Sequence, residues 1–207
     1  MCRWIAFLLT LLIIPGAWAR DKCVIYKTKP NVQINKPDWV KKVGQPLKVM
    51  DFYHGNVVAT LVDEYDIIVN IDELPNRDGF CVGVKTINAV IGYSDFLIKI
   101  DMRHAMNTCS YKTVLEHEGE HIKAYLSVID DFQDDLKDSV YSAANSIMPI
   151  HVKNEGDISS AIDEINYKLQ NHPDLILVKQ KISSAEELRN TKVDEENKHY
   201  EELANCK

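Results

Sequence analysis

The hydrophobic pattern of this chain changes its period once, between residues 101 and 109. Before this point, short segments rich in Val, Ile and Tyr are separated by turn residues, a pattern typical of β-strands. After it, apolar residues recur at steps of three, four or seven, as they do along one face of a helix. Strands followed by helices, rather than the two in alternation, indicate an α+β fold. We therefore expect an N-terminal antiparallel sheet followed by a helical C-terminal half.

The sheet should contain about five strands. The last strand-like segment, "FLIKID" at 96–101, nearly alternates between apolar and polar residues, which indicates a strand with one solvated face. Turn residues around 75–79 and at Gly92 divide the β-rich half into pieces. The expected strands cover residues 24–28, 47–52, 57–62, 66–72, 81–90 and 96–101.

The longest helical pattern begins near Cys109 and reaches about Ile147, before a proline. One long helix fits this pattern, and so do two helices with a break near residues 130–131. The start is also open, because Thr113 with Glu116 matches a capping box while Ser110 is a second candidate for the cap. The apolar stripe consists of Leu115, Ile122, Leu126, Ile129, Phe132, Leu136 and Val140.

Two further helices are predicted after this one. The first covers about 157–170 and the second about 183–205. The sequence Asn-His-Pro-Asp at 171–174 separates them, because proline and its neighbours favour a turn.

The first 19 residues have the organisation of a secretory signal peptide. Arg3 is their only charge, an apolar run follows at 5–14, and a small-x-small cleavage site lies at 17–19. The run is too short to span a membrane, and no later segment has the roughly 20 apolar residues of a transmembrane helix. We expect cleavage before Arg20, which leaves 20–207 as a single domain. The sequence thus predicts a secreted or periplasmic protein without membrane insertion after signal removal.

Charge and cysteine content agree with export. The chain carries 31 acidic and 24 basic residues, and such acidity argues against nucleic acid as a partner, since a phosphate-binding face needs clustered Lys and Arg. Four cysteines remain after the signal peptide, which indicates two disulfides with three possible pairings. We favour Cys81 with Cys109 and Cys23 with Cys206, a pairing that would tie the two chain ends together.

The motif that carries chemistry is His117-Glu118-Gly119-Glu120-His121. Residues four apart lie on the same face of a helix, so His117 and His121 can direct their imidazoles at one ion with Glu118 beside them. This is the H-E-x-x-H arrangement, in which two histidines hold Zn²⁺ and the glutamate is the general base for a zinc-bound water. The glycine costs a helix about 1 kcal/mol, which is reasonable where another backbone or a ligand comes close.

A simpler interpretation is a solvated helix face on which the two histidines have no metal. Under this interpretation, Glu116, Glu118, Glu120 and Lys123 are surface residues opposite the apolar stripe.

A catalytic zinc site also needs a third protein ligand. We expect His199, because on the last helix it shares a stripe with apolar residues, and a metal would satisfy its buried imidazole. Glu195 is expected to orient His199 or to replace it as the ligand. A local hydrogen bond between these two residues is the non-metal alternative. His104 and His151 are the reserve candidates.

Three pieces of the chain resemble one bacterial family. They are the strand region with Cys81, the segment CSYKTVLEHEGEH, and the tail DEENKH, which is similar to a closing Asp-x-x-Thr-x-His. The family consists of small exported proteins described as predicted secreted zinc-dependent proteases, and the resemblance covers roughly 81–200. It implies zinc-hydrolase roles for the motif residues and supports His199. The chain departs from the family at Glu120, where glycine is usual, and at Asn197, where threonine is usual.

Taken together, these patterns predict an exported zinc-dependent hydrolase, most simply a metallopeptidase with a peptide or protein substrate. Zn²⁺ is the expected cofactor, with His117, His121 and His199 as ligands and Glu118 as the general base. The alternative is a noncatalytic exported binding or envelope-structure protein, in which the motif is incidental or forms a structural metal site.

Overall fold

The computed structural model describes residues 22–45, 54–195 and 198–206, and the side chains of 198–200 are not among the described parts. The expected signal peptide and the expected strand at 47–52 lie outside the described residues. The strands are β1 (Asn31–Asn35), β2 (Val40–Gly44), β3 (Gly55–Glu73), β4 (Phe80–Ile100) and β5 (Ile150–Val152). The α-helices are α1 (Cys109–Asp131), α2 (Gln133–Ser146), α3 (Ile158–Gln170), α4 (Pro173–Glu195) and α5 (Lys198–Asn205).

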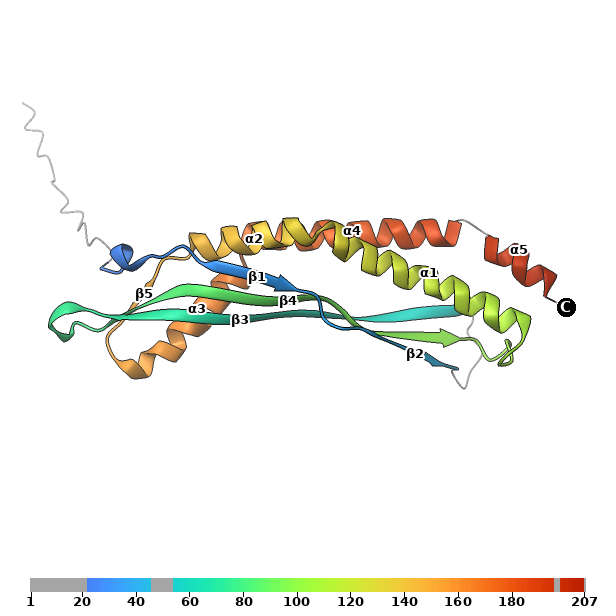
Figure 1. The fold of residues 1–207 in the computed structure, drawn as a ribbon, viewed down its shortest axis with the longest axis horizontal. Helices are drawn as coiled ribbons and strands as arrows, with labels where there is room; N and C mark the ends of the chain where they lie inside the picture. Colours follow the sequence, from blue (N-terminus) through green and yellow to red (C-terminus); the bar gives the residue numbers. More distant parts are fainter. Residues whose placement is uncertain (1–21, 46–53, 196–197, 207) are drawn as a thin grey trace, which may run out of the picture.

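The α+β prediction is confirmed, with an N-terminal sheet followed by a helical C-terminal half (Figure 1). A long antiparallel pair, β3 and β4, forms the body of the sheet. The other edge of β4 pairs in turn with β5, β1 and β2. The sheet is mixed and not antiparallel throughout as expected, because β1 and β2 each form a short parallel pair with β4.

Several expected strand boundaries were wrong. The segments 57–62 and 66–72 belong to one strand, β3, and 81–90 and 96–101 belong to one strand, β4. Gly92 does not end a strand. Its φ is +148°, and a Cβ at this position would lie 3.0 Å from Pro37, so both backbone conformation and space require glycine there. The expected strand at 24–28 instead contains the short 3-10 turn Val24–Tyr26.

Two β-bulges explain how so long a strand keeps its apolar side chains on one face. The register with β3 shifts between Ile68 and Val69 and again between Thr60 and Leu61. Each shift inserts one residue into β4, Lys85 and Ser94 respectively. A one-residue insertion exchanges the two faces of a strand. The buried β4 residues change parity at these points, from Val82 and Val84 to Ile87, Ala89, Ile91 and Tyr93, and then to Phe96, Ile98 and Ile100.

The helices α1, α2 and α4 lie along one side of the strands, while α3 crosses them obliquely in this view (Figure 1). Of the two alternatives that the sequence left open, the structure shows the break: α1 ends at Asp131, and Phe132 separates it from α2. The last expected helix starts ten residues too late, because α4 already begins at Pro173, a residue well suited to a first helical turn. Among the described residues, no helix is long and apolar enough to cross a membrane.

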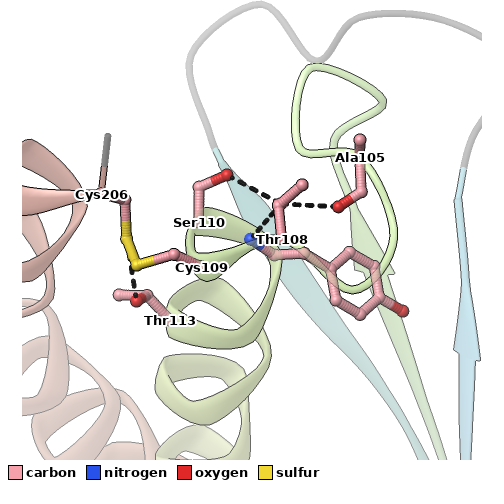
Figure 2. Close-up of a disulfide and its surroundings, with 7 residues drawn as sticks. Ala105, Thr108, Cys109, Ser110, Thr113 and Cys206 are labelled. Carbon is pink, nitrogen blue, oxygen red and sulfur yellow. Dashed lines mark hydrogen bonds between the residues drawn. A yellow bond between two sulfur atoms is a disulfide. The ribbon is translucent and has the colours of Figure 1, made fainter.

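The start of α1 also differs from the two candidates proposed from the sequence. Thr108 is the N-cap, and its Oγ1 accepts a hydrogen bond from the Tyr111 backbone N–H at 3.3 Å (Figure 2). Neither Ser110 nor Thr113 has this role, because both already lie inside the helix.

Two disulfides are present, but the expected pairing was wrong. Cys23 pairs with Cys81 and Cys109 pairs with Cys206, each with a Cα–Cα distance of 5.5 Å. Cys81 lies at the start of β4 and Cys109 follows its end, so the strand separates them by roughly 60 Å at about 3.3 Å per residue. A disulfide requires Cα atoms within about 7 Å, which excludes that pair. Instead, the second disulfide joins the first turn of α1 to the end of α5 (Figure 2).

Candidate metal centre

The two histidines of the motif lie on the partly buried face of α1. His117 and His121 are one helical turn apart, and their Nε2 atoms approach to 3.3 Å. Their side chains are only 11% and 13% exposed. Both imidazoles therefore direct the same ring nitrogen into one small volume, as the four-residue spacing predicts.

A third donor comes from α4. Asp194 Oδ1 lies 3.4 Å from His117 Nε2 and 3.2 Å from His121 Nε2. Within the part of the chain that the structure describes, these three residues form the one group of His, Cys, Asp or Glu side chains with donor atoms close enough to share a metal ion. The centre therefore joins residues of two helices, with Asp194 more than 70 positions after the two histidines in sequence.

Asn190 fixes the orientation of one imidazole. His121 Nδ1–H donates to Asn190 Oδ1 at 2.7 Å, and Asn190 Nδ2 donates to the Glu186 carbonyl at 2.8 Å. A proton on Nδ1 leaves the lone pair of His121 on Nε2, the atom that faces Asp194. Metal-binding histidines commonly have this arrangement, in which a hydrogen bond to the outer nitrogen fixes the tautomer.

Glu118 is buried beside the histidines, with 4% of its surface exposed. It lies on the buried face of α1, four residues from both Val114 and Ile122, which are also buried. No described side chain donates a hydrogen bond to its carboxylate. Burial, and to a smaller extent the charge of Asp194, raises the pKa of Glu118 to about 8. In the metal-free protein this group therefore holds its proton at neutral pH.

The close backbone approach lies at Gly55 and not at Gly119. A Cβ on Gly55 would lie 2.6 Å from Glu118 Oε1 and 2.8 Å from a methyl group of Val114. A Cβ on Gly119 would meet nothing within 4 Å. The first residue of β3 thus has to be glycine because α1, with its buried carboxylate, packs directly against the strand.

A cavity of about 220 Å³ opens over these residues. Its wall includes His54, whose Nδ1 shares a 2.9 Å hydrogen bond with Nε2 of the buried His104. Burial, followed by the proximity of His54, lowers the pKa of His104. The residues that line the cavity are His54, Gly55, Asn56, Val57, His117, Glu118, His121, Tyr125, Asn190 and Asp194.

The structure brings together His117, Glu118 and His121, three of the four site residues expected from the sequence. The fourth, His199, belongs to α5, but its side chain lies outside the described parts, so its role as a ligand stays a prediction. Glu195 ends α4 and is not part of the donor group.

The two reserve histidines, His104 and His151, lie outside the donor group. His104 bonds to His54, and His151 Nε2 donates to the Asp78 carbonyl at 2.8 Å.

Sequence reasoning missed Asp194 and Asn190. Asp194 is the first residue of the tail DEENKH, so the resemblance already contained a signal for it. Asn190 and Asp194 are also four residues apart on one helix, the same spacing as the two histidines. What the sequence lacked was the relative placement of α1 and α4, which makes this second pair face the first.

The chain was compared with protein-family models, with curated proteins and with solved structures, and no match was found in any of the three.

Proposed function

We propose that this protein is an exported zinc-dependent hydrolase, and specifically a metallopeptidase. In this proposal His117, His121 and Asp194 hold Zn²⁺, and Glu118 is the general base and acid. The spacing of the three donor atoms carries the proposal.

The donor atoms have the mutual distances that a tetrahedral zinc site requires. Ligands at about 2.0–2.1 Å from Zn²⁺ in a tetrahedron lie about 3.3–3.4 Å from one another. The three distances here are 3.2, 3.3 and 3.4 Å. Two imidazoles and one carboxylate favour zinc over Ca²⁺ or Mg²⁺, which prefer oxygen ligands. With three protein ligands, a bound Zn²⁺ would still have room for a water molecule, as in catalytic zinc sites.

The environment of Glu118 supports catalysis over a purely structural metal site. Bound Zn²⁺ would supply Lewis-acid activation of a water molecule. Glu118 is the one carboxylate of the cavity wall besides Asp194, and a buried carboxyl group without a hydrogen-bond donor is costly to a fold. A catalytic role would account for this free-energy cost, because the carboxylate would accept a proton from the attacking water and pass it to the leaving amine.

A peptide substrate is supported by the strand beside the cavity. Gly55, Asn56 and Val57 line the cavity at the start of β3, and among the described residues β3 pairs only with β4. An extended peptide can add to such a free edge by backbone hydrogen bonding. Residues 55–62 carry no charge, whereas acidic residues begin at Asp63. The Asn56 Oδ1 atom is also buried without a hydrogen-bond partner among the described residues, and a substrate N–H would satisfy it.

Export is supported by the two disulfides, which are typical of proteins in oxidising compartments such as the periplasm or the extracellular medium. The apolar N-terminal run and the small-x-small site point the same way. The resemblance to predicted secreted zinc-dependent proteases also agrees with export.

The test is metal analysis of the purified chain together with a Glu118→Gln variant. We expect one zinc per chain in both proteins, with peptide hydrolysis by the wild type and a loss of at least about 100-fold in the variant. A chain that takes up no stoichiometric zinc contradicts the proposal. Zinc in both proteins, with no hydrolysis by either across a broad peptide library, favours the noncatalytic binding or structural role instead.

A further inference from the structure

Tyr125 occupies the same face of α1 as the two histidines. It follows His121 by four residues and His117 by eight, and its side chain lines the cavity with them. Positions 117, 121 and 125, which are spaced four residues apart on α1, thus all line one cavity.

The Tyr125 ring is held in place by the sheet. Its centroid lies 5.1 Å from that of Tyr93 in an edge arrangement and 6.2 Å from that of Phe96, both on β4. The Tyr93 hydroxyl in turn donates to a carboxylate oxygen of Glu186 on α4. Aromatic contacts with a buried strand leave the ring little freedom, so its hydroxyl has a defined position.

Tyr125 lines the cavity, and its hydroxyl makes no hydrogen bond with any residue that the structure describes. Burial, and then the charge of Glu186, raises the pKa of Tyr125, so the phenol keeps its proton throughout the physiological range. The group is a neutral hydrogen-bond donor one helical turn from a proposed zinc ligand.

We propose that Tyr125 is a further catalytic residue, whose hydroxyl donates a hydrogen bond to the substrate carbonyl oxygen as that oxygen gains negative charge. The inference rests on the proposed function. When water adds to the carbonyl carbon, the electron pair of the C=O π bond moves to this oxygen, and a fixed donor there lowers the barrier. Tyr125 keeps its proton. The proton lost by water goes to Glu118 and then to the leaving amine nitrogen as the C–N bond breaks.

The test is Tyr125→Phe in the zinc-loaded full chain, with Tyr111→Phe on the same helix as the control. Phenylalanine keeps the ring contacts, so folding and zinc content should equal those of the wild type. We expect kcat for peptide hydrolysis to fall about 100-fold, as for loss of one oxyanion donor, while KM changes less than about threefold. Affinity for a phosphinic peptide, which mimics the tetrahedral oxyanion, should fall in parallel. Tyr111→Phe should leave both unchanged.

The outcomes separate this inference from the proposed function. Wild-type kcat and wild-type phosphinic-peptide affinity in Tyr125→Phe overturn the role of Tyr125 and leave a zinc hydrolase intact. An increase in KM with unchanged kcat also overturns it, because that change indicates ground-state binding alone. A wild-type chain that neither takes up zinc nor binds the phosphinic peptide overturns the proposed function, and the role of Tyr125 with it.

Discussion

The two helices that form the candidate metal centre hold their side chains in different ways. On α1, His117 and His121 are almost buried and Glu118 is fully part of the packed face against the sheet. On α4, the buried residues lie only in its first half, and the Asp194 side chain near its end is 65% exposed. Packing fixes the first set, whereas polar contacts hold the second. A substitution in the buried set on α1 should therefore reduce stability or zinc affinity more than a substitution in the exposed set on α4.

The polar contacts that hold the end of α4 are few and specific. Arg189 donates to Ser127 Oγ and forms an ion pair with Asp131, both on α1. One residue later, Asn190 accepts the hydrogen bond from His121. Exposed contacts of this type are each worth about 1 kcal/mol or less, in contrast to the several kcal/mol that buried side chains contribute.

The largest expected effect concerns the buried carboxyl group of Glu118 in the metal-free protein. Its pKa of about 8 in the folded state lies above its ordinary value of 4.5, so between these pH values the folded state binds more protons than the unfolded state. The free energy of unfolding should therefore fall as pH rises from 4.5 to 8, by up to about 5 kcal/mol. Glu118→Gln should remove most of this slope.

The measurement is urea unfolding at several pH values with a chelator present. Glu120→Gln is the matched control, because Glu120 is in the same motif but its side chain is 55% exposed. It should keep the wild-type slope. A wild-type slope that Glu118→Gln leaves unchanged would show that another group dominates the pH dependence.

The next effect compares the proposed zinc ligands of the two helices. His121→Ala should weaken zinc binding by roughly 10³-fold or more, which exceeds the 10- to 100-fold typical of changes outside the ligand set. Asp194→Ala should weaken it less, by about 100-fold, because a water molecule can replace an exposed carboxylate. Competition with a chelator of known affinity measures both. His199→Ala decides the third ligand: a loss larger than that of Asp194→Ala supports His199, as the sequence predicted.

The next comparison is between Gly55 on β3 and Gly119 on α1, and the expected effects on stability are smaller. Gly55→Ala should destabilise the protein by about 2–3 kcal/mol, because the new methyl group would overlap Glu118 and Val114. Gly119→Ala should stabilise it by up to about 1 kcal/mol, since alanine favours a helix and has free space there. Urea unfolding with zinc bound measures both changes. Equal effects of the two substitutions would contradict the tight contact at β3.

The difference between features set within one element and contacts between distant elements explains what the sequence could and could not predict. The strand-to-helix order and the helical placement of the α1 motif follow from local periodicity, and both are found. Glu118 also had a local signal, since it lies four residues from Val114 and from Ile122, both apolar. The contacts that join distant elements had no such signal. Gly55 and Glu118 lie close together although they are 63 residues apart in sequence, and the sequence around neither residue indicates this contact.

The errors in strand length and cysteine pairing share one cause. We expected strand breaks at residues 63–65 and 91–95, but β3 stays paired with β4 through the first segment, and in the second β4 accommodates Ser94 as a bulge. The resulting long strand places Cys81 and Cys109 at opposite ends, which excludes the pairing that we expected. Bulges depend on the partner strand, so the sequence of one strand does not reveal them.

The smallest expected effect concerns Asn190, the polar contact between α4 and His121. Asn190→Ala should weaken zinc binding by about tenfold, the lower end of the range for residues that orient a ligand, because His121 loses the acceptor that fixes its tautomer. Asn190→Asp keeps that acceptor and should restore most of the affinity. Asn171→Ala is the matched control: Asn171 also donates to the carbonyl four residues earlier but lies outside the centre. If Asn171→Ala weakens zinc binding as much as Asn190→Ala, the effect reflects helix stability and not the orientation of His121.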